Sequence, residues 1–351
     1  MKRCTQCLLP ETFPRVRFNE DGRCNFCAKH ERKHPQHDTT PSPRDAARKA
    51  RLKARMERLL ERKRGQGEYD CLIGFSGGKD STFLLNHFKE VYGLRVLAYT
   101  CDTGFLADVA RDNITHALSK LGVDHVWRRP CPSFYHRMYA KLLGHPPRRG
   151  CVRTICPNCF RATVIKAFQI AIEKQIPLVV LGLSPGQLPF RAYRVSRWII
   201  MALVALFKCS PRLLMGVSLS KEEKAEFDIP LADFSKIPDV ILPFQALEYD
   251  IERNTESILD KGLVERGKES PLVTNCLVNL AMMETDWQCL GHNPYAKEFA
   301  ELLREGQIDR DEWLAVDEQI RQGTFEREKI DFVREKLGLP KSQHAAVNEG
   351  Q

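Results

Sequence analysis

The stretch "CLIGFSGGKDST", residues 71–82, constrains the fold of this chain more than any other. An apolar run, 71–75, stops at a turn with two adjacent glycines, and a second apolar run at helical spacing, 83–88, follows. Because glycine adopts backbone conformations that other residues avoid, the pattern predicts a strand, a tight turn and a helix. The amino end of a helix offers free N–H groups and a positive dipole to an anion. The stretch therefore predicts a phosphate-binding turn.

The Walker loop is the first candidate for this turn, and the residues exclude it. That motif needs a glycine where the chain has Ile73 and a hydroxyl where it has Asp80. The stretch instead resembles the SGGxDS signature of the PP-loop ATP pyrophosphatases. Enzymes of that family adenylate a substrate oxygen, release pyrophosphate, and let nitrogen or sulfur displace AMP. An ordinary strand-to-helix turn is the alternative, and six matched residues count against it.

The resemblance implies a role for each loop residue. The amides and hydroxyls of the loop surround the β and γ phosphates of ATP. Lys79 acts as a point charge on departing pyrophosphate. Asp80 holds Mg2+, a hard ion that prefers carboxylate and phosphate oxygen. The residues placed around the phosphates are Ser76, Gly77, Gly78, Asp80 and Ser81.

Two further segments complete the nucleotide site that the resemblance implies. The end of "LAYTCDTGF" places Asp102 and Gly104 beside the adenosine, and Gly182 in "VVLGLSP" touches the nucleotide. Asp102 also has a purely structural interpretation as the N-cap of a helix that starts at Leu106. That role is compatible with binding.

Alternating strand-like and helix-like segments predict the fold class. They predict an α/β fold with a doubly wound parallel sheet, whose ligands bind at the carboxyl ends of the strands. Ser76, Asp102 and Gly182 all fall at such ends. The expected strands are "DCLIGFS", "LRVLAYTCD", "DHVWRRP" and "PLVVLGLS", and the expected helices are "STFLLNHFKEVYG", "LADVARDNITHALSKLG" and "CFRATVIKAFQIAIEKQ".

We predict four consecutive regions. Residues 1–35 form a zinc knuckle, 36–66 a basic helical linker, 67–190 the PP-loop ATP-binding domain, and 191–351 a mostly helical region for substrate binding and oligomerisation. A basic helix is usually a solvated face, with RNA contact the alternative. We expect a homo-oligomer.

Charge, cysteine content and the first residues of the chain limit the classes of ligand, compartment and chemistry to be expected. The 351 residues carry 54 basic and 45 acidic side chains, a net charge of +9 that suits ATP, a nucleotide sugar or RNA. The start, Met1 to Cys4, has no secretory pattern, so we expect a cytoplasmic protein. In that setting 13 cysteines indicate metal or redox chemistry and not disulfides.

One run, "WIIMALVALF" at 198–207, is apolar throughout. It is too short to span a bilayer, so we predict a buried helix and no stable membrane insertion. A helix on a membrane surface is the alternative.

The first cysteines have the spacing C-x2-C-x16-C-x2-C. Four thiolates at this spacing close a tetrahedral zinc site and leave no position open for catalysis. The segment is too short to form a core of its own, which argues against four free cysteines. An iron–sulfur cluster is the alternative. The ligands are Cys4, Cys7, Cys24 and Cys27.

The knuckle also sharpens the resemblance. "RCTQCLLPETFPRVRFNEDGRCNFC" resembles the start of N-acetyl sugar amidotransferases, PP-loop enzymes of surface-polysaccharide and lipopolysaccharide synthesis. This resemblance covers the first half of the chain and implies nitrogen transfer, with ammonia from a separate glutaminase. Several tRNA-thiolating PP-loop enzymes also carry a knuckle before the loop. The similar segments continue through "SGGKDSTFLL", "LAYTCDTGF", "NITHALSKLGVDHV" and "IPLVVLGLSP".

A second set of cysteines favours sulfur. Cys156, Cys159 and the distant Cys276 resemble the tRNA thiolases, in which three cysteines hold a [4Fe–4S] cluster and leave one iron open. The alternatives are a second zinc site with Cys151, a redox pair, or core cysteines. Cys101 and Cys131 are weaker candidates.

Three functions follow from these patterns. The leading one is an AMP-forming enzyme that uses ATP, Mg2+ and Zn2+ and replaces a substrate oxygen with nitrogen on an N-acetyl sugar. The alternative is sulfur transfer to tRNA or a small metabolite, with a sulfur donor as partner. A non-catalytic RNA adaptor is the third, and the intact "SGGKDS" counts against it.

Overall fold

The computed structural model describes residues 1–33, 43–184, 192–210, 217–229, 236–268, 275–304, 306 and 308–341. The chain forms two compact units. Unit 1 combines Met1–Thr40, His136–Pro157 and Cys276–Gln351, and unit 2 combines Pro41–Tyr135 and Asn158–Asn275. This division differs from four consecutive regions, because unit 1 is assembled from three separate segments of the chain.

A six-stranded sheet of order β3-β2-β1-β4-β6-β5 forms the centre of unit 2. Neighbouring strands are parallel except β5, which is antiparallel to β6. The predicted α/β fold with a largely parallel sheet is confirmed. The strands are β1 Cys71–Gly74, β2 Val96–Cys101, β3 Asp124–Arg128, β4 Leu178–Val180, β5 Arg194–Val195 and β6 Asp239–Ile241.

Two strands come from the part of the chain beyond residue 190. β5 has 2 residues and β6 has 3, so neither is long enough to produce an alternating pattern in the sequence. The expectation of a mostly helical region there missed them. They extend the sheet because β6 pairs in register with β4, joining Leu178 to Asp239 and Val180 to Ile241.

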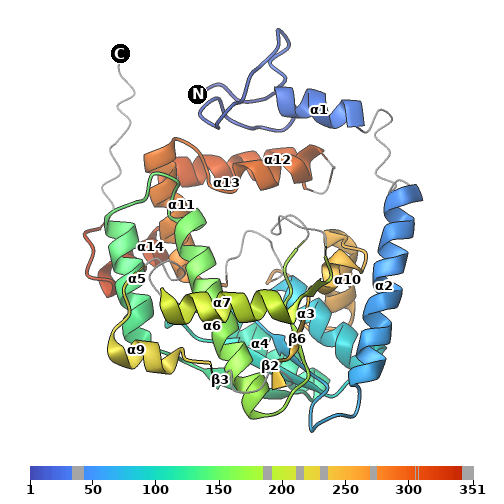
Figure 1. The fold of residues 1–351 in the computed structure, drawn as a ribbon. Helices are drawn as coiled ribbons and strands as arrows, with labels where there is room; N and C mark the ends of the chain where they lie inside the picture. The colour runs from blue at the N-terminus through green and yellow to red at the C-terminus, as the bar shows by residue number, and fades with distance from the viewer. Residues whose placement is uncertain are drawn as a thin grey trace. The chain divides into compact units, whose positions relative to one another are not determined.

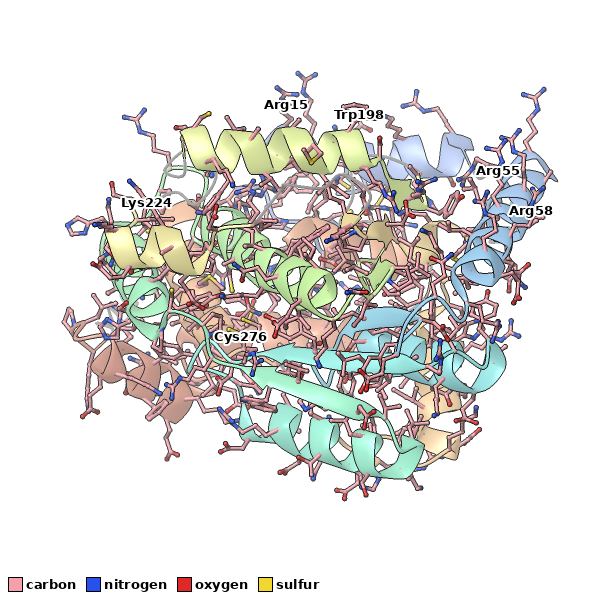
Figure 2. All side chains as sticks on the ribbon, turned by 60° about the horizontal axis from the view of Figure 1, so that its bottom comes forward. Arg15, Arg55, Arg58, Trp198, Lys224 and Cys276 are labelled. Atoms are coloured by element: carbon pink, nitrogen blue, oxygen red, sulfur yellow. The ribbon has the colours of Figure 1, made fainter. Side chains whose placement is uncertain are left out.

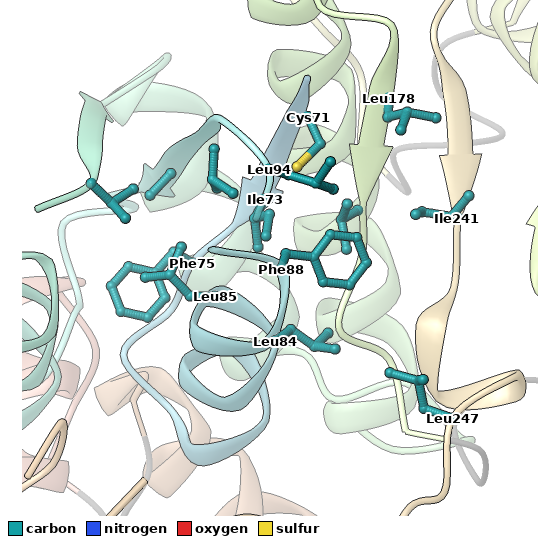
Figure 3. Packing of buried hydrophobic residues seen from close by; sticks show 14 of the residues in the cluster. Cys71, Ile73, Phe75, Leu84, Leu85, Phe88, Leu94, Leu178, Ile241 and Leu247 are labelled. Carbon is teal, nitrogen blue, oxygen red and sulfur yellow. The ribbon is translucent and has the colours of Figure 1, made fainter. Parts of the chain in front are cut away.

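Helices cover both faces of the sheet (Figure 1). Successive residues of a strand point to opposite faces. Ile73 of β1 therefore belongs to one buried cluster, with α2, α3, α4 and the end of α10. Leu72 belongs to a second cluster, with α6 and α7. Figure 3 shows the first cluster between β1, β4, β6 and α3. The helices are α2 Pro43–Lys63, α3 Lys79–Asn86, α4 Asp108–Leu121, α6 Val152–Glu173, α7 Arg197–Cys209, α9 Lys221–Glu226 and α10 Ile251–Asp260.

Two predicted helices have different bounds from those expected. The helix after the glycine turn passes at His87 into a π-helical turn, His87–Val91, where the Tyr92 N–H donates to the His87 carbonyl at 3.0 Å. The helix expected from Cys159 begins at Val152, so Cys156 lies inside α6 and not ahead of it. Pro157 lies inside the helix and removes the N–H that would donate to the Arg153 carbonyl.

Unit 1 contains the cysteine knuckle and short helices. The knuckle cysteines pack with Phe13, Ala296 and Ala300 in one buried cluster. Part of the apolar surface that covers the knuckle is therefore supplied by α12. α11 contacts α13 and α14. The helices are α1 Asn25–Lys33, α5 Pro132–Gly144, α11 Leu277–Leu290, α12 Ala296–Arg304, α13 Arg310–Gln322 and α14 Arg327–Lys336. α5 begins at the end of unit 2, and this helix was not predicted from the sequence.

The apolar run 198–207 forms α7, but the prediction of a buried helix is wrong for one of its faces. Ile200, Val204 and Phe207 are buried at the spacing i, i+4, i+7. Trp198, Ile199 and Leu203 are exposed. A single sheet can cover only one side of a helix, whatever residues the other side carries. No helix in the described part of the chain is long and apolar enough to cross a membrane.

Candidate nucleotide site and cysteine centres

The loop between β1 and α3 is closed by its two serines. The Ser81 hydroxyl donates to the Gly78 carbonyl at 3.0 Å and accepts the Ser76 N–H at 3.2 Å. The two serine hydroxyls are 3.1 Å apart. Ser81 therefore folds the loop back over the first turn of α3. The loop is thus held in shape by side chains that the motif itself supplies.

Gly77 has no room for a side chain. Its φ is +74°, and a Cβ there would lie 2.5 Å from the Ala110 carbonyl oxygen and 2.9 Å from Cγ1 of Ile114. The Gly77 carbonyl accepts a hydrogen bond from the buried Asn113 amide at 3.4 Å. The first glycine of the turn is therefore required both by its φ and by the close approach of α4. Asn113 was not predicted as part of the site. A polar residue on the apolar side of the helix that contains "NITHAL" was a signal of a buried hydrogen bond.

Asp80 and Lys79 form a small polar cluster with Tyr249. The Lys79 ammonium lies 3.0 Å from Asp80 Oδ1, and the Tyr249 hydroxyl lies 3.2 Å from Asp80 Oδ2. Lys79 Nζ is also 3.4 Å from that hydroxyl. The Tyr249 ring packs edge-on against Phe244, with 4.9 Å between the ring centroids. Tyr249 was not predicted, because nothing in the local sequence links it to a loop 169 residues earlier.

Asp102 lies at the carboxyl end of β2 and is buried. Its carboxylate accepts the Gly104 N–H at 2.8 Å and pairs with the Arg111 guanidinium at 3.0 Å. Burial acts to raise the pKa of Asp102, but these partners outweigh it and lower the pKa. The suggested N-cap role is wrong, because α4 begins at Asp108 with Ala107 at the cap. Arg111 was not predicted.

Gly104 and Gly182 both occupy positions of close approach. Gly104 has a φ of +87°, and a Cβ there would lie 2.9 Å from Nη2 of Arg129. A Cβ on Gly182 would lie 3.2 Å from Leu84 Cδ1 and 3.9 Å from the Ser81 backbone. Gly182 therefore lies against the amino end of α3, beside the loop. The sheet order reverses between β1 and β4, which is where ligands bind in doubly wound sheets.

The four knuckle sulfurs converge on one point in unit 1. Within the described residues, these four are the one group of three or more histidine, cysteine or acidic side chains with ligand atoms within 4.8 Å of one another. The Cys4–Cys27 and Cys7–Cys24 sulfurs are 3.7 and 3.6 Å apart. Ligand atoms about 2.3 Å from a central zinc and tetrahedrally arranged are separated by roughly this distance. The group can therefore hold one metal ion.

Cys156 and Cys276 both belong to unit 1 and interact electrostatically there. Cys156 lies in α6, and Cys276 occupies the N-cap position of α11 and not the interior of an apolar helix. Burial, with a smaller contribution from Cys276, raises the pKa of Cys156 to about 12. Burial also raises the pKa of Cys276. It raises the pKa of Tyr295 as well, and electrostatic interactions with both thiols add to that rise. Both thiols are partly exposed.

Cys159 also lies in α6 but belongs to unit 2, because the division between the two units falls after Pro157, inside this helix. Burial raises the pKa of Tyr135, and interactions with Cys101 and Cys159 add to the rise. Cys101 Sγ lies 3.5 Å from the Tyr135 hydroxyl. The convergence of Cys156, Cys159 and Cys276 on one cluster stays a prediction. Cys131, the other weak candidate, has a positive φ of 38° just before α5.

Cys151 has a structural role at the amino end of α6. Its N–H donates to Asp286, and the Val152 N–H donates to the same carboxylate at 3.0 Å. The Cys151 thiol donates to the Leu142 carbonyl at 3.4 Å. A buried carboxylate thus satisfies two N–H groups that a helix start leaves free. The expectation of a second zinc site with Cys151 has no support in this contact pattern.

Comparison with known proteins gives distant similarity. No family model matches the chain. An uncharacterized protein of Methanocaldococcus jannaschii is 28% identical over 141 residues, 40% of this chain and 47% of that protein, so the chain spans about half the length of the curated relative it matches.

Two solved structures of low identity are also similar. The U34-tRNA thiolase NcsA from Methanococcus maripaludis with its [4Fe–4S] cluster is 13% identical, with a TM-score of 0.36 over 100% of this chain and 94% of that one. NMN synthetase from Francisella tularensis is 14% identical, with a TM-score of 0.30 over 84% and 98%. Both TM-scores are low, so neither structure determines the fold of this chain. The resemblance to the PP-loop ATP pyrophosphatases rests on the sequence of the loop, which the structure places between β1 and α3.

Proposed function

We propose that this protein is an ATP-dependent enzyme that forms AMP and pyrophosphate while activating a substrate oxygen. The observation that carries the proposal is the Asp80–Lys79 pair at the amino end of α3, beside a serine-closed glycine loop. A carboxylate next to phosphate suits Mg2+, and an ammonium suits a phosphate that gains charge as it leaves. The buried Asp102 and the close-packed Gly104 and Gly182 would bound the nucleotide.

The reaction divides into two displacements. The acceptor oxygen attacks the α phosphorus, the bond between the α phosphorus and the bridging oxygen breaks, and pyrophosphate carries away the electron pair. Lys79 and the N–H groups at the start of α3 would stabilise the charge on pyrophosphate. A nitrogen or sulfur nucleophile then attacks the acceptor carbon, and AMP leaves with the original oxygen.

We propose nitrogen as the transferred atom and an N-acetyl sugar as the acceptor. The support is the resemblance of the knuckle and of the four later segments to N-acetyl sugar amidotransferases. A separate glutaminase would supply the ammonia. Sulfur transfer is the second candidate, and its support is the resemblance of Cys156, Cys159 and Cys276 to the three cluster-binding cysteines of the tRNA thiolases. In that case Cys159 would be the third ligand of an iron–sulfur cluster that carries sulfur.

The test measures AMP and pyrophosphate from ATP and Mg2+ in two parallel reactions. One contains a nucleotide-linked N-acetyl hexosamine and ammonium, and the other contains unmodified tRNA and a sulfide donor, without oxygen. We expect acceptor-dependent AMP in the first. AMP formation that requires tRNA and sulfide would favour sulfur transfer over nitrogen transfer. Absence of AMP in both, from folded protein, would contradict the proposed function.

Three single substitutions and one control connect the activity to named residues. Asp80→Ala should remove AMP formation, because the carboxylate beside the loop is lost, and Asp260→Ala is the matched control on the exposed end of α10. Cys156→Ala and Cys276→Ala should leave ammonia-dependent turnover measurable. If either change bleaches an iron-containing protein and stops turnover, the sulfur candidate replaces the leading one.

A further inference from the structure

α7 presents an apolar face that its own unit leaves exposed. The exposed fractions are 75% for Trp198, 54% for Ile199, 48% for Leu203 and 37% for Leu206. Three of these residues follow the spacing i, i+4, i+7 of one helix face, and Trp198 extends the face at the amino end. Large apolar side chains gathered on one exposed face indicate an interaction surface more strongly than the same residues scattered singly.

α2 presents a stripe of arginines. Its buried residues, Leu52, Met56, Leu59 and Leu60, fix which side of the helix faces the core. The arginines recur at intervals of four and three residues, which places them along one line of the helix about 27 Å long. All are exposed except Arg48, which is half-buried. The arginine stripe is Arg44, Arg48, Arg51, Arg55, Arg58 and Arg62.

The two helices share the buried carboxylate of Asp239 at one end of each. Lys63 at the end of α2 lies 3.5 Å from it, and Arg197 at the start of α7 lies 3.1 Å from it. Arg194 of β5 pairs with the same carboxylate. The amino end of α7 and the carboxyl end of α2 are therefore close together in unit 2. Figure 2 shows Trp198 projecting from α7 and Arg55 and Arg58 projecting from α2, all away from the body of unit 2.

We propose that the α7 face and the arginine stripe together dock unit 2 on the surface of an anionic lipid bilayer. An amphipathic helix that binds lipid lies in the interface with its apolar side chains in the acyl boundary, and nearby cations attract anionic headgroups. Tryptophan at the edge of such a face suits the level of the headgroups. α7 is too short to span the bilayer, so the docking is peripheral.

RNA is the other polyanion that an arginine stripe suits, and the α7 face argues against it. Proteins bind RNA through phosphates and through aromatic rings that stack on bases. Of the four residues of the α7 face, Ile199, Leu203 and Leu206 are aliphatic, so Trp198 alone offers a ring to stack on a base. A bilayer uses both surfaces, because burial of apolar area and attraction of charge add to the same binding free energy.

The experiment is sedimentation of the whole protein with vesicles in the absence of ATP, so that its result is independent of the proposed reaction. We expect binding to vesicles of phosphatidylcholine and phosphatidylglycerol in equal parts, a weaker interaction with phosphatidylcholine alone, and loss of binding at high salt. Trp198 should report insertion as a blue shift of its fluorescence. Trp198→Phe should remove that shift and keep most of the binding.

Matched variants separate the two surfaces. Ile199→Gln should weaken binding roughly tenfold, because its side chain no longer enters the apolar layer. Val91→Gln, at an apolar residue of unit 2 that is 60% exposed, is its control. Arg55→Gln with Arg58→Gln should weaken binding about 30-fold, from roughly 1 kcal/mol per basic residue. Arg253→Gln with Arg266→Gln, two exposed arginines of the same unit, is the control for charge.

Three outcomes would overturn the proposal. The first is failure of the folded wild-type protein to sediment with the anionic vesicles. The second is equal binding by Ile199→Gln and wild type. The third is tighter binding to a labelled RNA stem-loop than to vesicles, lost with the α2 pair and unchanged by Ile199→Gln, because the stripe would then belong to an RNA surface.

Discussion

Single residues of the loop act through contacts that the motif does not contain. Asp80 lies between the Lys79 ammonium and the Tyr249 hydroxyl, so its carboxylate has a fixed orientation. Tyr249 is itself held by packing against Phe244. Tyr249 is thus a positioning residue for Asp80, which the proposed reaction uses at the phosphates.

Tyr249→Phe should therefore lower kcat for AMP formation with little change in thermal stability. Loss of one hydrogen bond to a carboxylate costs about 1.5 kcal/mol, which corresponds to roughly tenfold in rate. Tyr69→Phe is the matched control, because the Tyr69 hydroxyl lies 2.9 Å from a carboxylate, Asp124, distant in the sheet from the loop. Equal kcat values for the two variants, measured as AMP released, would contradict the assigned role.

Asp102 predicts a dependence of stability on pH. Its pKa in the folded protein is below the ordinary value of 3.8, so its charged form stabilises the fold fully above that value. The stabilisation is lost as the pH falls through the lowered folded pKa. The difference in unfolding free energy between wild type and Asp102→Asn should be constant from neutral to weakly acidic pH. It should then shrink below pH 3.8, as measured by urea unfolding. A difference that grows on acidification would show the wrong sign.

At the scale of elements, the start of α6 depends on a carboxylate from another helix. Asp286 of α11 accepts the N–H groups of Cys151 and Val152, and it is fully buried. The contact holds α6 in place close to Cys156. Gly150, which has a φ of +94°, gives the carboxylate room to approach, because a Cβ there would lie 2.9 Å from Asp286 Oδ2.

Asp286→Ala should destabilise unit 1 by about 2–3 kcal/mol, because two buried N–H groups lose their acceptor. The control is Asp309→Ala, which removes the solvent-exposed cap of α13 and should cost about 1 kcal/mol. Urea denaturation of both variants, followed by circular dichroism, checks the order of the two effects. A smaller loss for Asp286→Ala than for Asp309→Ala would contradict the account.

For the whole molecule, the division into two units predicts independent responses to metal removal. We propose that the four knuckle cysteines bind one zinc, and the knuckle has only a small cluster of apolar contacts to hold it without the ion. The sheet of unit 2 has two large apolar clusters of its own.

Chelation should therefore raise hydrogen exchange in residues 1–33 and leave exchange in β1, β2 and β4 unchanged. Metal analysis should find one zinc per chain, lost in Cys4→Ser and Cys24→Ser. Exchange that rises equally in the strands, or protein purified without zinc or iron, would contradict this prediction. Cys209→Ser, at an exposed cysteine of α7, is the control.

The sequence by itself determined the features that depend on residues close together in the chain. The strand, glycine turn and helix at 71–88 follow from local backbone preferences, and the alternation of such segments defined the parallel sheet. The cysteine spacing likewise placed four thiols around one point. These features are readable because each one needs only the periodicity or the spacing of its own segment.

Only the tertiary structure decided which distant residues complete each site. Tyr249, Asn113 and Arg111 reach the loop and Asp102 because helices and connections from elsewhere in unit 2 pack around the sheet. The exposure of α7 is also a tertiary result, since an apolar helix does not specify how many of its faces will be covered. β5 and β6 are too short to carry a periodic signal, and they exist because β4 offers an unpaired edge. Contacts of this kind depend on the free energy of the assembled unit, which no local pattern encodes.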